Sequence, residues 1–114
     1  MPAGKLDSYL KLDGVLAALV VRDGTVQGEA GSPGADTGML AVTLTLLMKE
    51  SARIAGKVGG GRVSSVILEF GDKLLFVQAQ NDSQFLVVIT SPGISLTRLY
   101  RELGITRVKE GPGA

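Results

Sequence analysis

The sequence contains no cysteine, no histidine and no tryptophan, and aromatic residues make up only 4% of it. Without cysteine, the chain has no disulfides, no thiol nucleophile and no Cys-based zinc or iron–sulfur site. Without histidine, the commonest general base and transition-metal ligand is missing. Its 12 basic and 11 acidic residues give a net charge of +1, so we expect no binding of nucleic acid. These absences favour a binding or assembly module, without cofactor or metal, over an enzyme.

Long hydrophobic runs are also missing. The longest nearly uncharged run, Gly24–Lys49, contains Glu29, Asp36 and Pro33, so we expect no membrane insertion. Residues 1–11 lack the apolar region of a signal peptide, which favours a cytoplasmic protein. Asparagine occurs once and cysteine never, and the depletion of both is typical of thermophilic proteins.

The length and hydrophobicity predict one domain. The chain has 114 residues, of which 45% are hydrophobic, enough for one globular core. We expect this core to span about residues 5–104, with 105–114 as a tail. Periodicity and turn residues predict the order α-β-β-α-β-β-β-α, with helices over 5–12, 36–58 and 94–103 and strands over 14–21, 25–30, 62–70, 73–80 and 84–90.

Short turns join most of the predicted strands. Asp23-Gly24 is typical of a type I′ hairpin, because both central residues of that turn need a positive φ. Gly71-Asp72 fits a second two-residue turn, with glycine at its first central position, where a positive φ is favoured. Two strands that are apolar on both faces would lie at the centre of the sheet, and more polar strands at its edges. We therefore predict an α+β fold, a three-layer α/β/α sandwich with a five-stranded antiparallel sheet, of the profilin-like kind.

The predicted long helix carries more apolar surface than one sheet can cover. Asp36 is placed to cap its start, and Gly59–Gly61 to end it. One apolar stripe has helical spacing and comprises Leu40, Leu44, Leu47, Ile54 and Val58. Other apolar residues fall outside this stripe: Met39, Val42, Leu46 and Met48. The first half of the helix is thus apolar nearly all round, which indicates that a partner covers part of it.

Three groups of residues could suggest catalysis, and each has a structural explanation that we favour. The glycines at 56 and 59–61 lack the spacing of a phosphate loop and follow a helix rather than precede one. Ser64 and Ser65 could pair with Lys73 as a nucleophile, but polar positions on an edge strand explain them as well. The carboxylates of the N-terminal region come without the aromatic walls of a typical carboxylate-pair site.

Basic residues recur every four positions on the long helix, at Lys49, Arg53 and Lys57. This spacing places them on one face. They could bind an acidic partner, or supply an arginine to the phosphate chemistry of another protein. The alternative is a plain solvent-exposed face.

Several segments together resemble the Roadblock/dynein light chain family. They are residues 14–24, the long helix ending at 59–61, the strand over 63–70 and residues 85–92. The resemblance implies the fold predicted above and a non-catalytic module that dimerises and partners Ras-like small GTPases, in some bacterial members as a GTPase-activating partner. In dimers of the family the edge strand pairs with its symmetry mate and the long helices lie antiparallel.

From the residues and this resemblance we expect a homodimeric regulator or scaffold for a Ras-like GTPase. We predict a dimer interface at Met39, Leu44, Met48, Val63, Ser65 and Ile67, and GTPase docking at Lys49, Arg53 and Lys57. Two alternatives stay open. One is a profilin- or PAS-like sensor of a small ligand, and the other is a purely structural subunit of a motor or polarity complex.

Overall fold

The computed structural model of the chain describes residues 3–93 and residue 101. The described elements are, in order, α1 (Ala3–Tyr9), β1 (Val15–Arg22), β2 (Thr25–Gly31), α2 (Thr37–Lys57), β3 (Ser65–Glu69), β4 (Leu74–Ala79) and β5 (Gln84–Thr90). The predicted order is confirmed for these elements. Of the helix predicted over 94–103 only Arg101 is described, and it is helical; the other residues of that helix and the tail lie outside the described residues.

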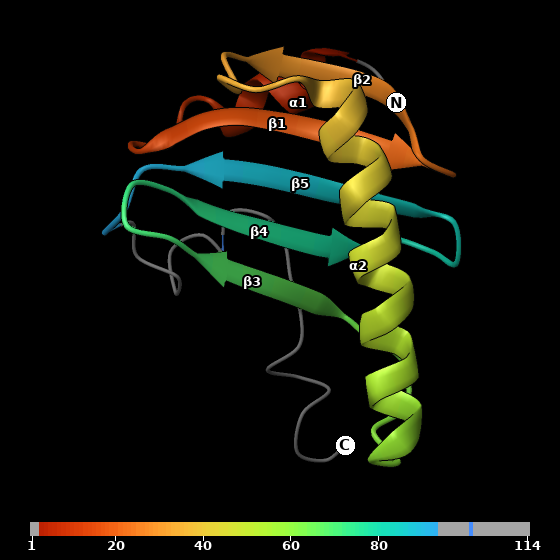
Figure 1. Cartoon of the computed structure of the whole chain (residues 1–114). Helices are drawn as coiled ribbons and strands as arrows, with labels where there is room; N and C mark the ends of the chain where they lie inside the picture. Colours follow the sequence, from red (N-terminus) through yellow and green to blue (C-terminus); the bar gives the residue numbers. More distant parts are fainter. Residues whose placement is uncertain (1–2, 94–100, 102–114) are drawn as a thin grey trace.

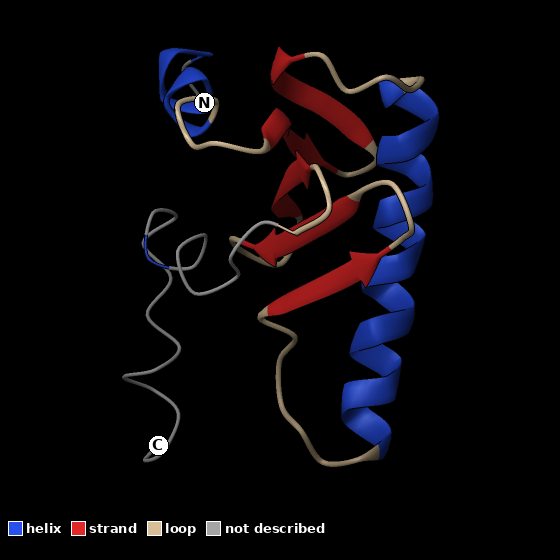
Figure 2. Cartoon of the chain, turned by 90° about the vertical axis from the view of Figure 1, so that its left-hand side faces the viewer, coloured by secondary structure: helices blue, strands red, loops and turns tan. Residues whose placement is uncertain are grey.

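The strands form one antiparallel sheet in the order β2-β1-β5-β4-β3. Helix α1 lies on one face of the sheet and α2 on the other (Figures 1 and 2). The central strands β1 and β5 are the apolar ones, and the more polar β2 and β3 are at the edges. The predicted three-layer α+β architecture is therefore confirmed.

The core consists of two layers, one on each face of the sheet. Successive residues of a strand point to opposite faces, so Ala18 and Val20 of β1 pack toward α1. Ala17, Leu19 and Val21 pack toward α2. All five are fully buried, which explains why this strand is an uninterrupted apolar run.

The tight turns follow the local sequence. Asp23 has φ 49° and Gly24 has φ 79°, as the predicted type I′ turn requires. The loop of Gly71 and Asp72 is closed by the Phe70 N–H, which donates to the Lys73 carbonyl at 2.8 Å. Strand β3 is shorter than predicted at both ends, because Phe70 begins this turn and residues 62–64 belong to the loop after α2.

Both ends of α2 are fixed by the residues that the sequence places there. The Asp36 carboxylate accepts from the Met39 N–H at 3.1 Å, which satisfies one of the free donors of the first turn. At the other end Gly59 has φ 67°, and the Gly60 N–H donates to the Ala55 carbonyl at 2.8 Å. This is a Schellman ending, so the structural explanation of these glycines is confirmed.

Gly31 has a strict steric requirement, and we expect its substitution by alanine to destabilise the fold. It has φ +84°, and an added Cβ would lie 2.3 Å from the Leu16 carbonyl oxygen and 2.9 Å from the Ala17 Cα. Gly34 is the matched control, because it has φ +68° and nothing within 4 Å of an added Cβ. In urea unfolding we expect Gly31→Ala to cost about 3 kcal/mol and Gly34→Ala about 1 kcal/mol, the strain of the left-handed conformation alone. Equal losses would contradict the close contact.

Candidate interaction surfaces

Helix α2 is longer than the sheet is wide. Its 21 residues span about 32 Å, whereas five strands spaced at about 4.8 Å span about 19 Å. The helix runs across the strands, and its C-terminal part extends past β3 (Figures 1 and 2). Its contacts with the core come from Leu40, Ala41, Leu44, Leu47 and Met48. Beyond Met48 the helix contributes no residue to the core.

The predicted apolar stripe on α2 therefore divides into two parts. Leu44 is 2% exposed, and Leu40 and Leu47 are half-buried against the sheet. Ile54 and Val58 are 61% and 75% exposed. At about 100° per residue both lie on the same flank of the helix as Leu47. This overhanging flank is apolar, and none of the described strands lies beneath it (Figure 1).

Strand β3 presents an open edge beside the overhang. The Ala79 N–H donates to the Ser64 carbonyl, and the Phe70 N–H to the Lys73 carbonyl. Hydrogen-bonding groups alternate along an antiparallel pair, so the even-numbered residues face β4. The main-chain groups of Ile67 and Glu69 consequently point to the outer edge, and no described strand lies beyond it. Such an edge can pair with another strand.

The opposite edge, β2, is modified in ways that discourage pairing. Its pairing with β1 shifts at a bulge between Val20 and Val21. The Thr37 hydroxyl donates to the Glu29 carboxylate at 3.1 Å, which ties the strand to the start of α2. A bulge and an exposed charge are features that protect an edge strand from pairing. Of the two edges, β3 is thus the better candidate for an interface.

The predicted interface residues do not form one surface. Val63, Ser65 and Ile67 are half-buried at or next to β3. Leu44 and Met48, in contrast, pack into the core under α2. Met39 is 64% exposed, but it belongs to the first turn of α2, at the end of the helix away from β3 (Figure 1). Sequence periodicity could not assign these faces without knowing where the sheet lies.

The basic residues predicted for docking do share one face. Each residue of an α-helix is rotated by about 100° from the one before it. Lys49, Arg53 and Lys57 therefore lie within about 40° of the direction opposite Leu44, and so away from the sheet. All three are exposed. Arg53 forms an ion pair with Glu50 at 3.0 Å, with both side chains more than 60% exposed. A pair this exposed contributes little to stability, so Arg53 is available to a partner.

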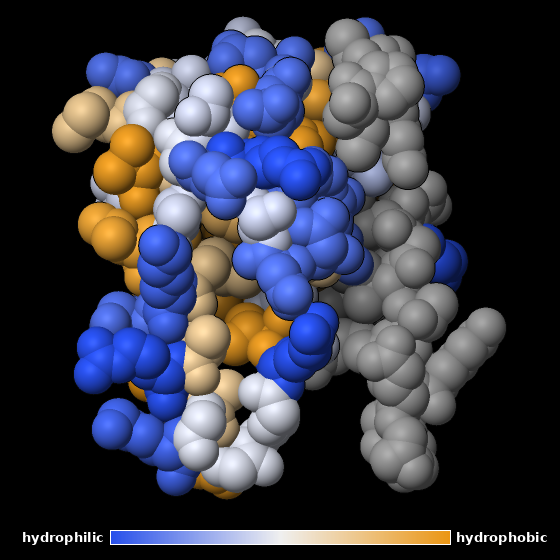
Figure 3. All heavy atoms as spheres, turned by 90° about the vertical axis from the view of Figure 1, so that its right-hand side faces the viewer, coloured by the Kyte–Doolittle hydropathy of each residue, from blue (hydrophilic) through white to orange (hydrophobic). Residues whose placement is uncertain are grey.

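Three apolar residues continue the same face toward the start of α2. They are Met39, Val42 and Leu46, which are 64%, 48% and 59% exposed and also lie within about 40° of the outward direction. We call these six residues the outer stripe: Met39, Val42, Leu46, Lys49, Arg53 and Lys57. Along the left-hand side of Figure 3, hydrophobic atoms lie above hydrophilic ones. The spacing of the sequence predicts the basic half of this stripe but not its continuity with the apolar half.

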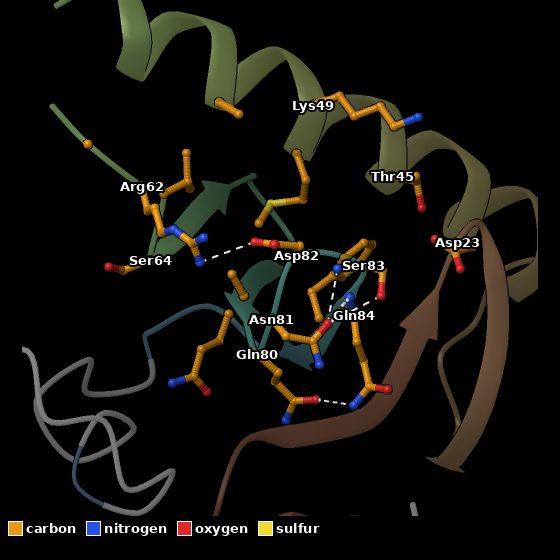
Figure 4. A pocket seen from close by; sticks show the side chains of 17 residues that line it. Asp23, Thr45, Lys49, Arg62, Ser64, Gln80, Asn81, Asp82, Ser83 and Gln84 are labelled. Atoms are coloured by element: carbon orange, nitrogen blue, oxygen red, sulfur yellow. Dashed lines mark hydrogen bonds and ion pairs between the residues drawn. The ribbon is translucent and has the colours of Figure 1, made fainter. Parts of the chain in front are cut away.

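An open cleft of about 580 Å³ lies between α2 and the turn joining β4 to β5 (Figure 4). Arg62 and Asp82 lie toward one another at 3.1 Å. The Asn81 side chain accepts from the Ser83 and Gln84 N–H groups, both at 3.0 Å, and fixes the turn. This cleft could not be predicted from the sequence, because its walls come from four separate parts of the chain.

The cleft does not select a ligand by charge. Its two cations, Lys49 and Arg62, are balanced by Asp23 and Asp82. All four side chains are exposed, so water screens them. The charges of its lining therefore favour neither an anion nor a cation.

The serine–lysine pair, for which the sequence favours a structural explanation, is not formed. Ser65 pairs with Gln78 at one end of the β3–β4 hairpin, whereas Lys73 lies in the turn at the other end. Within residues 3–93 and 101, no group of three acidic side chains could hold a metal ion. None of the helices in that part of the chain is both long and apolar enough to span a bilayer.

Comparison with known proteins identifies the fold. No family profile matches the chain, and no curated protein matches its sequence. Solved structures do match. A Roadblock/LC7 domain from Streptomyces avermitilis superposes with a TM-score of 0.82 at 20% identity, over 91% of this chain and 89% of that chain.

Structures of MglB also match. Myxococcus xanthus MglB superposes with a TM-score of 0.71 at 21% identity, over 84% of this chain and 77% of its own. An MglB described as having a tetrameric arrangement gives 0.74 at 18% identity, over 92% and 85%. The chain therefore has the Roadblock/LC7 fold, as its sequence segments indicated.

Proposed function

We propose that this chain is a non-catalytic homodimeric regulator or scaffold that binds a Ras-like small GTPase. The observation that carries the proposal is the overhang of α2 beside the open edge of β3, in a chain with the Roadblock/LC7 fold. A soluble monomer gains nothing from exposing Ile54 and Val58, whereas an interface buries them.

One two-fold arrangement covers both features at once. If β3 pairs antiparallel with its own copy, the sheet continues from one protomer into the next. Each α2 then projects over the sheet of the other protomer, and the two overhanging flanks face each other. Ile54 and Val58 become buried, and the main-chain groups of Ile67 and Glu69 find partners. The tetrameric arrangement described for one MglB supports self-association of this fold.

The basic half of the outer stripe is the proposed contact for the GTPase. It lies on the exposed side of α2, with Lys49 also at the rim of the cleft, and away from the proposed dimer interface, so a partner can reach it in the dimer. Lys49, Arg53 and Lys57 would steer an acidic surface toward α2. Arg53 can exchange Glu50 for a partner carboxylate or, in an activating role, for the transferred phosphate.

The test uses a small GTPase encoded beside this chain. We expect it to bind, and Arg53→Ala to weaken binding about tenfold, the effect of losing one charge-assisted contact. Arg62→Ala is the matched control, because Arg62 is an exposed, ion-paired arginine off the stripe, and it should bind like the wild type. Titration in each nucleotide state measures binding.

GTP hydrolysis with and without this chain separates the two roles. Acceleration that falls by about 10³-fold or more with Arg53→Ala identifies an arginine supplied to the phosphate. Acceleration that persists means that the chain orders residues of the GTPase itself, and binding without acceleration means a scaffold. If no adjacent GTPase binds in any nucleotide state, the proposed function is wrong.

A further inference from the structure

The outer stripe is divided along its length. The first 12 residues of α2, from Thr37 to Met48, contain no charged residue. All charges of the helix come after them, at Lys49, Glu50, Arg53 and Lys57. The stripe therefore has an apolar half about 10 Å long, followed by a basic half about 12 Å long.

The apolar half needs a partner that the proposed dimer does not provide. Met39, Val42 and Leu46 lie in the first half of α2, on the face opposite Leu44, and all three are exposed. Pairing of β3 strands and overhanging flanks would leave them exposed. Three neighbouring large apolar side chains on one exposed helix face are typical of a docking surface.

We propose that the outer stripe binds an amphipathic helix of a partner protein that runs antiparallel to α2. The first two turns of the partner helix carry acidic residues and lie over the basic half. Its next two turns carry apolar residues at i, i+3, i+4 and i+7 and lie over Met39, Val42 and Leu46. The proposal rests on the proposed function in taking the partner to be a protein, and it adds which structural element of that protein binds.

The antiparallel direction follows from helix electrostatics. The N-terminal turns of a helix favour acidic residues, and its C-terminal turns disfavour them. A parallel partner would have to place its acidic residues in its own C-terminal turns to reach Lys49, Arg53 and Lys57. An antiparallel partner places them at its N-terminus. Its positive dipole end then also faces the negative C-terminal end of α2.

The stripe fits a protein helix better than a membrane surface. A helix that lies on a membrane has an apolar face along its whole length, with cations beside that face. In α2 the apolar and basic residues follow one another along one line, and Glu50 offsets Arg53. A lipid surface presents the same chemistry to the apolar half and to the basic half. An antiparallel helix can place apolar residues on the first and acidic residues on the second.

The test uses a fluorescein-labelled synthetic peptide of 20 residues. It has four glutamates in its first two turns and leucines at i, i+3, i+4 and i+7 in the following turns. The control peptide has the same composition with the two halves exchanged. Fluorescence anisotropy with the full chain is expected to give a Kd of roughly 10–100 μM for the first peptide. We expect binding at least about tenfold weaker for the control peptide, and weaker binding of the first at high salt.

Two variants locate the binding. Leu46→Asp should weaken binding of the first peptide at least about tenfold, and Phe70→Asp should not, because Phe70 is 53% exposed but lies in the β3–β4 turn. Circular dichroism checks that both variants fold.

Equal binding of the two peptides, or an unchanged Kd with Leu46→Asp, overturns the proposal. Binding of phosphatidylserine vesicles that is lost with Leu46→Asp, together with no peptide binding, assigns the stripe to membranes instead. The GTPase titration does not involve the peptide, so the two proposals fail separately.

Discussion

Replacing Ile54 and Val58 together by aspartate is expected to convert a dimer into a folded monomer. Both side chains are mostly exposed in the single chain, so their replacement removes no contact with the core. In the proposed dimer both become buried. Burial of each side chain is worth about 1.5 kcal/mol or more, and a two-fold interface counts every substitution twice. A loss of about 6 kcal/mol weakens the dimer by more than about 10⁴-fold.

Light scattering at micromolar concentration measures the result. We expect the wild type at twice the 11.8 kDa of one chain, or at a higher multiple, and the double variant at the mass of one chain. Met39→Asp with Leu46→Asp is the matched control, because these residues are as exposed but lie on the outer stripe. This control should remain dimeric. A wild-type mass of one chain, or a double variant that stays dimeric, contradicts the proposed interface.

The sequence predicts local structure well wherever one residue type satisfies one backbone requirement. Asp23-Gly24 supplies two positive φ angles, Asp36 caps a helix, and Gly59 ends it. Each of these depends on neighbours within four residues. Gly71 shows the limit, because its turn has the predicted length but the glycine does not adopt a positive φ.

Longer-range features could not be predicted, because they depend on how wide the sheet is relative to α2. Apolar periodicity groups Leu44 with Ile54, yet the first is buried and the second lies beyond the sheet edge. For the same reason, periodicity does not show that Met39 and Leu44 lie on different faces of α2, and the predicted interface contains both. The candidate cleft depends on a contact across the fold, in which the Asp23 N–H donates to the Ser83 carbonyl at 3.1 Å.

The outer stripe is a different case, since its spacing was present in the sequence. Met39, Val42 and Leu46 precede the three basic residues at steps of three or four. Apolar residues lie on every side of the first half of α2, so the sequence does not indicate which side of the helix faces solvent. The structure shows that Leu44 faces the sheet, and this defines the outer stripe as the opposite side.

Cysteine cross-linking is expected to trap β3 against its own copy. The chain has no cysteine, so each single-cysteine variant carries one thiol per protomer. In a two-fold antiparallel pair only the residue on the axis lies opposite itself, at a Cα separation of about 5 Å. Residues two positions away are about 13 Å from their own copies, because each step along a strand is about 3.3 Å. A disulfide requires Cα atoms closer than about 7 Å.

Ile67 is the central residue of β3. If the two-fold axis passes through Ile67, all five residues of the strand pair with residues of the second copy. We therefore expect mild oxidation to convert Ile67→Cys almost completely into a covalent dimer, visible on a non-reducing gel, and Ser65→Cys and Glu69→Cys to remain mostly monomeric. If cross-linking is most efficient at another β3 residue, the two-fold axis lies at that residue and the strand pairing is kept.

Glu29→Cys on β2 is the control for the opposite edge. Efficient cross-linking through residue 29, or equal weak cross-linking everywhere, would contradict pairing of β3. A dimer paired through β2 would leave the overhang of α2 uncovered. Cross-linking through residue 29 would therefore show that the strand contact and the helix contact of the proposed dimer do not occur together.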